Sequence, residues 1–197
     1  MAFVVGAVGA VLFVVVFLID GLTRPGYSPV RQPVSALALG GRGWIQTANF
    51  LVCGAAVTVG GVAVVLAGQY VLGSLLAVFG LGLVASGLFR MDPMRGYPPG
   101  TPDTDPAEFS RLHQLHDHAG TVVFFSLPVT AVVGVFVMPG LVWKVLTVAV
   151  VIALVIALSA FSRAWESASP RTGLAQRAFI VPGWLWVAAV FLNFAST

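Results

Sequence analysis

The sequence predicts an all-α membrane protein: a single domain over residues 1–197 that forms a bundle of six transmembrane helices. Hydrophobic residues make up 58% of the chain and charged residues only 9%, and the mean hydropathy is +0.98. This composition is typical of polytopic membrane proteins and lies outside the usual range of soluble domains. A transmembrane helix needs about 20 mostly apolar residues. The runs that meet this requirement are 2–19, 44–67, 70–89, 119–138, 141–161 and 178–195.

The first three runs carry further local signals. The first begins directly after Met1 with no preceding Lys or Arg, which favours a retained helix over a signal peptide. Cys53, the only cysteine, lies inside the second run, so a disulfide within the chain is excluded and a packing thiol is expected. Small residues recur in the second and third runs at spacings that allow close helix contact. These are Gly54, Thr58 and Gly61, then Gly80, Gly82, Ser86 and Gly87.

The polar residues are concentrated on one side of the predicted bundle. With six spans, the long connections 20–43, 90–118 and 162–177 lie on the same side, and we call them the polar cap. All basic residues except Lys144 and all acidic residues lie in the cap. Because short cytoplasmic loops are enriched in Lys and Arg, this bias predicts a cytoplasmic cap and extracytoplasmic termini. Solute transport is disfavoured, since transporters bind substrates at polar groups near the bilayer midplane.

The fourth helix is predicted to begin before its apolar run. Asp105 has the features of an N-cap, with Pro106 at the first helical position and Glu108 placed to return a capping bond. All three histidines then fall in the first turns of this helix, in the stretch RLHQLHDHAG at 111–120. At about 100° per residue, His113, His116 and Asp117 share one face of the helix, whereas His118 points elsewhere.

This histidine face supports three interpretations. His113 and His116 can hold a divalent metal, with further ligands from Asp92 or Glu166. Alternatively, His113 acts as a general base oriented by Asp117, or with Asp92 carries proton transfer. The third interpretation is structural, in which these side chains only hydrogen-bond the neighbouring loops. A haem is not expected, because bis-histidine ligation needs ligands from facing helices.

Arginines in the cap suggest an anion-binding site. Guanidinium groups bind phosphate and carboxylate in a bidentate manner. Arg24 and Arg90 follow predicted helices, and Arg177 directly precedes the last one, so we expect these three to point into the cap. An internal ion pair between Arg90 and Asp92 is the structural alternative. Topological anchoring and attraction to anionic membrane lipids account for the remaining basic residues.

Several short motifs resemble a known family over nearly the whole chain. They are Arg24-Pro-Gly-Tyr27-x-Pro29, Ser35-x-Leu37, Trp44, Asn49-Phe50, Gly87-x-Phe89-x-x-Asp92-Pro93, Leu112-His113 and Gly173-Leu-Ala-Gln-Arg177. Together they resemble the bacterial integral-membrane family of domain of unknown function 998, DUF998. The resemblance implies six helices in a bacterial inner (plasma) membrane but no reaction. It singles out Arg24, Tyr27, Ser35, Asn49, Asp92, His113 and Arg177; His116 and His118 are outside its pattern.

Three classes of function follow from these observations. The leading hypothesis is binding of an amphipathic or lipid-like molecule at the cap. Its anionic head would contact Arg24, Arg90 and Arg177, with Tyr27, Ser35 and Asn49 as further ligand-binding residues. The second is a membrane enzyme that uses His113 with Asp92 or Asp117, with or without a metal. The third is an assembly partner for another membrane protein. Nucleic-acid binding is not expected, because the net charge is only +3 and the basic groups lie against the membrane.

Overall fold

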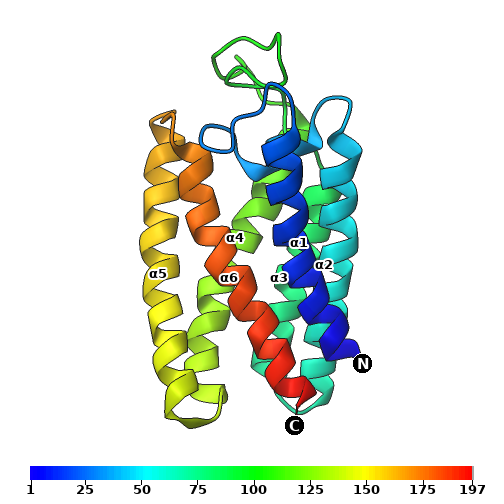
Figure 1. The fold of residues 1–197 in the computed structure, drawn as a ribbon, viewed down its shortest axis with the longest axis vertical. Helices are drawn as coiled ribbons and strands as arrows, with labels where there is room; N and C mark the ends of the chain where they lie inside the picture. The colour runs from blue at the N-terminus through cyan, green and yellow to red at the C-terminus, as the bar shows by residue number, and fades with distance from the viewer. Residues whose placement is uncertain (197) are drawn as a thin grey trace.

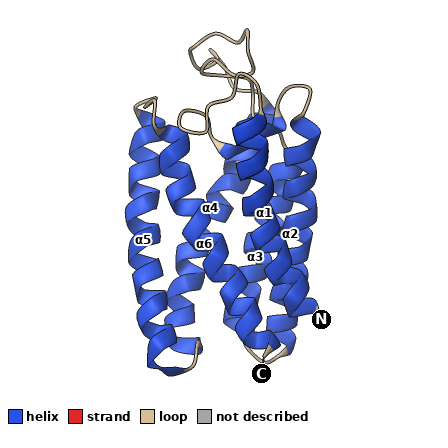
Figure 2. Ribbon diagram, in the orientation of Figure 1, coloured by secondary structure: helices blue, strands red, loops and turns tan. Residues whose placement is uncertain are grey.

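The computed structural model describes residues 1–196 and is entirely helical apart from connections and one isolated bridge (Figures 1 and 2). Its elements are α1 (Ala2–Thr23), η1 (Val34–Ala38), α2 (Gly43–Leu66), α3 (Tyr70–Leu88), α4 (Arg111–Val137), α5 (Gly140–Glu166) and α6 (Thr172–Ala195). All six α-helices are long and apolar enough to cross a membrane. The predicted six-helix membrane bundle is therefore confirmed.

The helices form a closed ring in chain order. Each packs against the next one along the chain, and α6 returns to pack against α1. Figure 1 shows both termini and the two short turns at one end of the bundle, with the three long connections together at the other. The cap is therefore a single surface, as the alternation of long and short connections predicts.

Glycines set the closest helix contact in the bundle, between α2 and α3. A Cβ added at Gly61 would lie 2.5 Å from the backbone nitrogen of Ala77, and one at Gly80 would lie 2.5 Å from the Thr58 hydroxyl. Both distances are far shorter than van der Waals contact, so neither position accepts a side chain. The small-residue pattern thus has the packing role that was predicted for it.

Aromatic rings fill the middle of the bundle below the cap. Trp184 of α6 stacks on Phe13 of α1 with ring centroids 5.4 Å apart, and meets Phe79 of α3 edge-on at 4.7 Å. All three side chains are at most 1% exposed. In contrast, only 17% of the apolar stretch of α5 is buried, so α5 is the peripheral helix of the ring.

The start of α4 differs from the prediction. Ser110 is the N-cap, since its hydroxyl accepts a bond from the backbone N–H of His113, and the helix begins at Arg111 instead of Pro106. The cause is that Asp105, the predicted N-cap, is engaged elsewhere: its carboxylate accepts two bonds from Arg95, of 2.6 and 2.9 Å. The last connection of the cap is shorter than predicted, because α5 continues to Glu166 and α6 already starts at Thr172.

Candidate functional site

Arg24 holds the cap together from the end of α1. Its side chain is 6% exposed and forms an ion pair with Asp20, one turn back in the helix. It also donates to the carbonyl oxygens of Leu39 and Arg42, both at 2.9 Å, and to the Tyr97 hydroxyl at 3.3 Å. These bonds of its two terminal nitrogens join the first and third connections, whereas its Nε–H has no partner within residues 1–196. Arg24 lines no cavity among the described residues.

Arg177 has the equivalent role at the start of α6. It is 7% exposed and donates to the carbonyl oxygens of Pro29 and Gln32, at 2.7 and 3.1 Å, and to the Tyr27 hydroxyl at 2.5 Å. Burial raises the pKa of Tyr27 against the opposing effect of this guanidinium, so the phenol stays neutral and donates its proton to the carbonyls of 32 and 33. This cluster fastens the first connection to α6.

Two other predicted ligand residues also lie away from any cavity. The Asn49 amide donates to the Phe13 carbonyl at 3.1 Å and accepts from Cys53, so it joins α1 to α2 inside the bundle. Arg90 is exposed, and in the part of the chain described here it forms no ion pair. The alternative pairing of Arg90 with Asp92 is wrong, because the Asp92 carboxylate binds Ser110 instead.

Asp92 and Ser110 together fix the start of α4. The two carboxylate oxygens of Asp92 accept from the backbone N–H and the hydroxyl of Ser110, each at 2.7 Å. Burial opposes the charge of this carboxylate, but the two hydrogen bonds outweigh it and lower the pKa of Asp92. Asp92 is therefore an anionic clamp between the third connection and α4.

His113 lies inside this clamp and is only 1% exposed. Its Nδ1 accepts the backbone N–H of Asp92 at 2.8 Å, which places the proton of the neutral ring on Nε2. Nε2 lies 3.3 Å from the Asp117 carboxylate, within pairing distance but without hydrogen-bond alignment. The Phe109 ring stacks on the imidazole at 4.2 Å. His113 is thus a neutral, covered group that does not reach the cavity described next.

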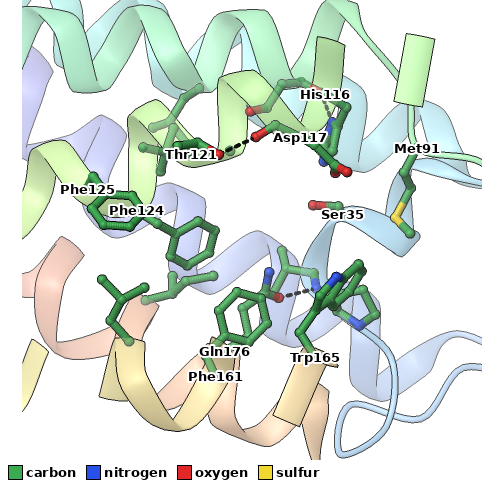
Figure 3. A pocket seen from close by; sticks show the side chains of 18 of the residues that line it. Ser35, Met91, His116, Asp117, Thr121, Phe124, Phe125, Phe161, Trp165 and Gln176 are labelled. Carbon is green, nitrogen blue, oxygen red and sulfur yellow. Dashed lines mark hydrogen bonds between the residues drawn. The ribbon is translucent and has the colours of Figure 1, made fainter. Parts of the chain in front are cut away.

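A cavity of about 310 Å³ lies between α4, α5 and α6, directly below η1. Its apolar part is formed by rings and aliphatic chains of several helices: Phe13, Phe124, Leu158, Phe161, Ile180 and Trp184. Its polar part is next to the cap. The polar side chains there are Ser35, His116, Asp117, Ser162, Glu166 and Gln176. In Figure 3, His116 and Asp117 project from α4 toward Ser35, opposite Gln176, Phe161 and Trp165, with Phe124 farther along α4.

His116 presents a lone pair to this cavity. Its Nδ1 lies 3.1 Å from the Ser86 carbonyl and 2.8 Å from that of Phe89. Because carbonyl oxygens only accept, Nδ1 carries the proton, and Nε2 of the neutral ring has an unshared pair. Nε2 forms no hydrogen bond with residues 1–196. His116 is 7% exposed, so it is a buried base at the cavity wall that can accept a hydrogen bond or a proton.

Gln176 faces His116 across the cavity and is 4% exposed. Its Oε1 accepts the backbone N–H of Val34 at 2.7 Å, which holds η1 against α6. The amide nitrogen is left to donate, and the described residues provide no acceptor for it. Ser35, on η1, also forms no side-chain hydrogen bond within residues 1–196 and lines the same wall. Of the predicted ligand-binding residues, Ser35 is the one that the structure brings to the cavity.

The predicted metal site is not supported by the geometry. No three His, Cys, Asp or Glu side chains within residues 1–196 come together to hold a metal ion. His113 and His116 do share a face of α4, but their Nδ1 atoms bind backbone groups of different residues. Asp92, which was expected as a further ligand, binds Ser110.

Sequence reasoning missed Gln176 and Trp165 as cavity residues and named Glu166 only as a possible metal ligand, although a signal for the α4 wall was present. Positions 116, 117, 120, 121 and 124 recur with the spacing of one helical face and change from polar to aromatic along it. Gly120 lies in this stripe, and a Cβ added there would meet nothing within 4 Å. The stripe therefore marks an unfilled wall of the bundle.

Comparison with known proteins gives one family. No curated protein and no solved structure matches the chain. A family model described as "Protein of unknown function (DUF998)" matches residues 7–193, nearly the whole chain. The match includes every element from α1 to α6 and both sides of the cavity. The chain is therefore a member of the DUF998 family, a family of proteins of unknown function.

Proposed function

We propose that this membrane protein binds an amphipathic, lipid-like small molecule in the cavity between α4, α5 and α6. The observation that carries the proposal is the division of that cavity: polar side chains at the cap end and aromatic and aliphatic side chains below them. Ligand sites commonly have this form, with a mostly apolar wall and a few convergent polar groups. The volume of about 310 Å³ lies at the small end of the range for such sites.

The cavity lies at a depth where an acyl chain already resides. Its apolar walls belong to helices whose outer faces are suited to lipid, and Phe125, which lines the cavity, is 61% exposed on the α4 surface. A chain can therefore enter from the bilayer while the head group stays beside the cap. This placement replaces the predicted contacts of the head with Arg24, Arg90 and Arg177, which do not line the cavity.

The proposal includes the orientation of the protein in a bacterial plasma membrane. The cap carries nearly all basic residues and is therefore placed on the cytoplasmic side, with both termini outside. The head group of the bound molecule would then lie at the inner leaflet.

Gly120→Phe is the direct test of binding. The new ring would enter the open space beside Gly120 and fill the cavity without a backbone clash. Val129→Phe is the matched control, since Val129 is on the same helix, is 51% exposed and lies outside the cavity lining. Native mass spectrometry of protein released from nanodiscs is expected to show a bound amphiphile that Gly120→Phe removes and Val129→Phe retains. Equal occupancy in the two variants would contradict the proposal.

A further inference from the structure

The charge of the cavity's polar end is opposite to what an anionic ligand needs. Two carboxylates, Asp117 and Glu166, line it, and no Arg or Lys is among its lining residues. Glu166 takes part in no ion pair or side-chain hydrogen bond within residues 1–196. Arg163, which precedes Glu166 by one helical turn, donates to Ser159 at 2.7 Å, and Arg95, which packs on Trp165, pairs with Asp105. Both carboxylates belong to exposed residues, and neither pairs with an Arg or Lys within residues 1–196, so the polar end has two negative charges without a fixed basic partner.

The imidazoles do not neutralise these carboxylates. His113 is the group closest to Asp117, at 3.3 Å, but its Nδ1 accepts the Asp92 N–H and must be unprotonated to do so. A ring in that state is neutral and offers only its Nε2 proton. His116 adds an acceptor instead of a charge, because its Nδ1 proton is directed at two carbonyl oxygens.

The buried acceptor at the polar end, His116, calls for a hydrogen-bond donor. His116 is more than nine-tenths buried, and its free Nε2 lone pair is an acceptor that no described residue satisfies. Together with the two carboxylates, it gives the polar end three acceptor groups. The available donors are the Gln176 amide and the Ser35 hydroxyl, which suit a hydroxyl or carbonyl next to the head.

Aromatic rings below the carboxylates favour a cation as well. Trp165 and Phe161 line the cavity with ring centroids 6.1 Å apart. One face of Trp165 already carries the guanidinium of Arg95, 4.6 Å from the ring centroid, so a cation packs on this ring in the protein. A positive charge over an aromatic face is attracted by the ring quadrupole, whereas an anion gains nothing there.

Resting on the proposed function, the geometry points to a more specific ligand: an amphiphile with a single cationic, hydrogen-bond-donating head, of the primary alkylamine class. Its ammonium group lies at the polar end of the cavity, where it donates to Nε2 of His116 and is attracted by the carboxylates that line that end, Asp117 and Glu166. Its alkyl chain runs along Phe124 and Phe161 toward Trp184. An alkyl phosphate would place its charge against two carboxylates and is rejected.

The test compares dodecylamine, dodecanol and dodecyl phosphate at equal concentration in zwitterionic nanodiscs, measured as bound mass by native mass spectrometry. Dodecylamine is expected to bind at least about tenfold more tightly than dodecyl phosphate, since one charged hydrogen bond corresponds to about a factor of ten. Asp117→Asn with Glu166→Gln is expected to weaken the amine by at least about tenfold and leave dodecanol unchanged. Ser167→Ala, an exposed cap change outside the cavity lining, is the matched control.

The outcomes separate the two proposals. If Gly120→Phe abolishes binding but dodecyl phosphate or dodecanol is the tightest ligand, the cavity is a lipid site and the cationic head is wrong. The cationic head is equally contradicted if the double carboxamide variant binds the amine as tightly as the parent does. If no amphiphile is displaced by Gly120→Phe, the proposed function itself fails. Circular dichroism and gel filtration of each variant exclude misfolding as the cause of lost binding.

Discussion

The contacts of Arg177 within the cap predict that the stability of the protein depends strongly on this one side chain. Replacing it by Ala would remove the donor to the carbonyl of Pro29 and to the Tyr27 hydroxyl, and one of the two donors to the carbonyl of Gln32. The bond to Gly173 lies within α6 and is discounted. Hydrogen bonds to a charged donor are each worth about 1.5–3 kcal/mol, and relaxation makes them non-additive. Because Arg177 is only 7% exposed, we expect a loss of about 3–5 kcal/mol in the free energy of unfolding.

The assay is thermal unfolding of purified protein in one detergent, followed by circular dichroism. A loss of that size corresponds to a fall in the midpoint of about 10 °C for a chain of this length. Arg177→Lys keeps the charge but provides a point donor in place of a planar fork, so it is expected to lie between the parent and Arg177→Ala. Arg171→Ala, an exposed neighbour without a side-chain bond, is the control. A midpoint for Arg177→Ala within about 2 °C of that control, about 1 kcal/mol or less, would refute the structural role of this guanidinium.

Three further predictions follow from the fold. Folding lowers the pKa of Asp92 and of Asp105 below 3.8, so their stabilisation is complete above that pH and is lost as the pH falls through the folded values. Asp92→Asn is expected to lower the free energy of unfolding by about 1 kcal/mol at pH 7. It is also expected to weaken the fall of the melting temperature at acidic pH. An unchanged pH dependence would contradict the role of Asp92 in fixing the start of α4. Gly61→Ala is expected to lower the free energy of unfolding by about 1–3 kcal/mol, because its Cβ would lie 2.5 Å from a backbone atom of α3. Gly120→Ala, in open space, is expected to raise it by about 0.5–1 kcal/mol. Equal melting points for the two variants would count against the close α2–α3 contact. The orientation of the protein in the membrane is tested with cysteines introduced at Ser167 and Ala67, which are both exposed and lie at opposite ends of the bundle. An impermeant maleimide applied to intact cells is expected to label only the cysteine at position 67. The native Cys53 is buried and gives little background.

The six spans and the one-sided cap could be predicted because a bilayer imposes strong constraints on sequence. Runs of apolar residues long enough to cross it leave few alternatives, and the structure extends them only at their polar ends, as at Arg111 and Thr172. The α4 start was predicted incorrectly because a local capping signal at Asp105 competes with a partner ten residues away, Arg95. Local patterns do not contain that information.

The candidate site was less predictable because the same residue types serve structure and binding. Arg24 and Arg177 have the composition of an anion site, yet their terminal nitrogens donate to carbonyl oxygens of the first connection. This outcome has a general cause: a connection that folds onto a bundle exposes backbone carbonyls to a place with little water, and a buried arginine satisfies several at once. His116 differs from them in having one ring nitrogen that the backbone leaves free.

The unequal burial of the helices indicates where the cavity opens. Half of the apolar stretch of α3 and of α6 is buried, against 33% for α4 and 17% for α5. The cavity lies along the boundary between these two groups, with its floor on the tightly packed Trp184 and its outer wall on Phe161 and Phe125. The least buried helices of the bundle, α4 and α5, face each other across this outer wall, whereas opening the first connection would break the bonds of Arg177 to its carbonyl oxygens. We therefore expect an amphiphile of the proposed kind to enter sideways from the bilayer, between α4 and α5, with its head moving along the cap side of α4 to Asp117 and His116.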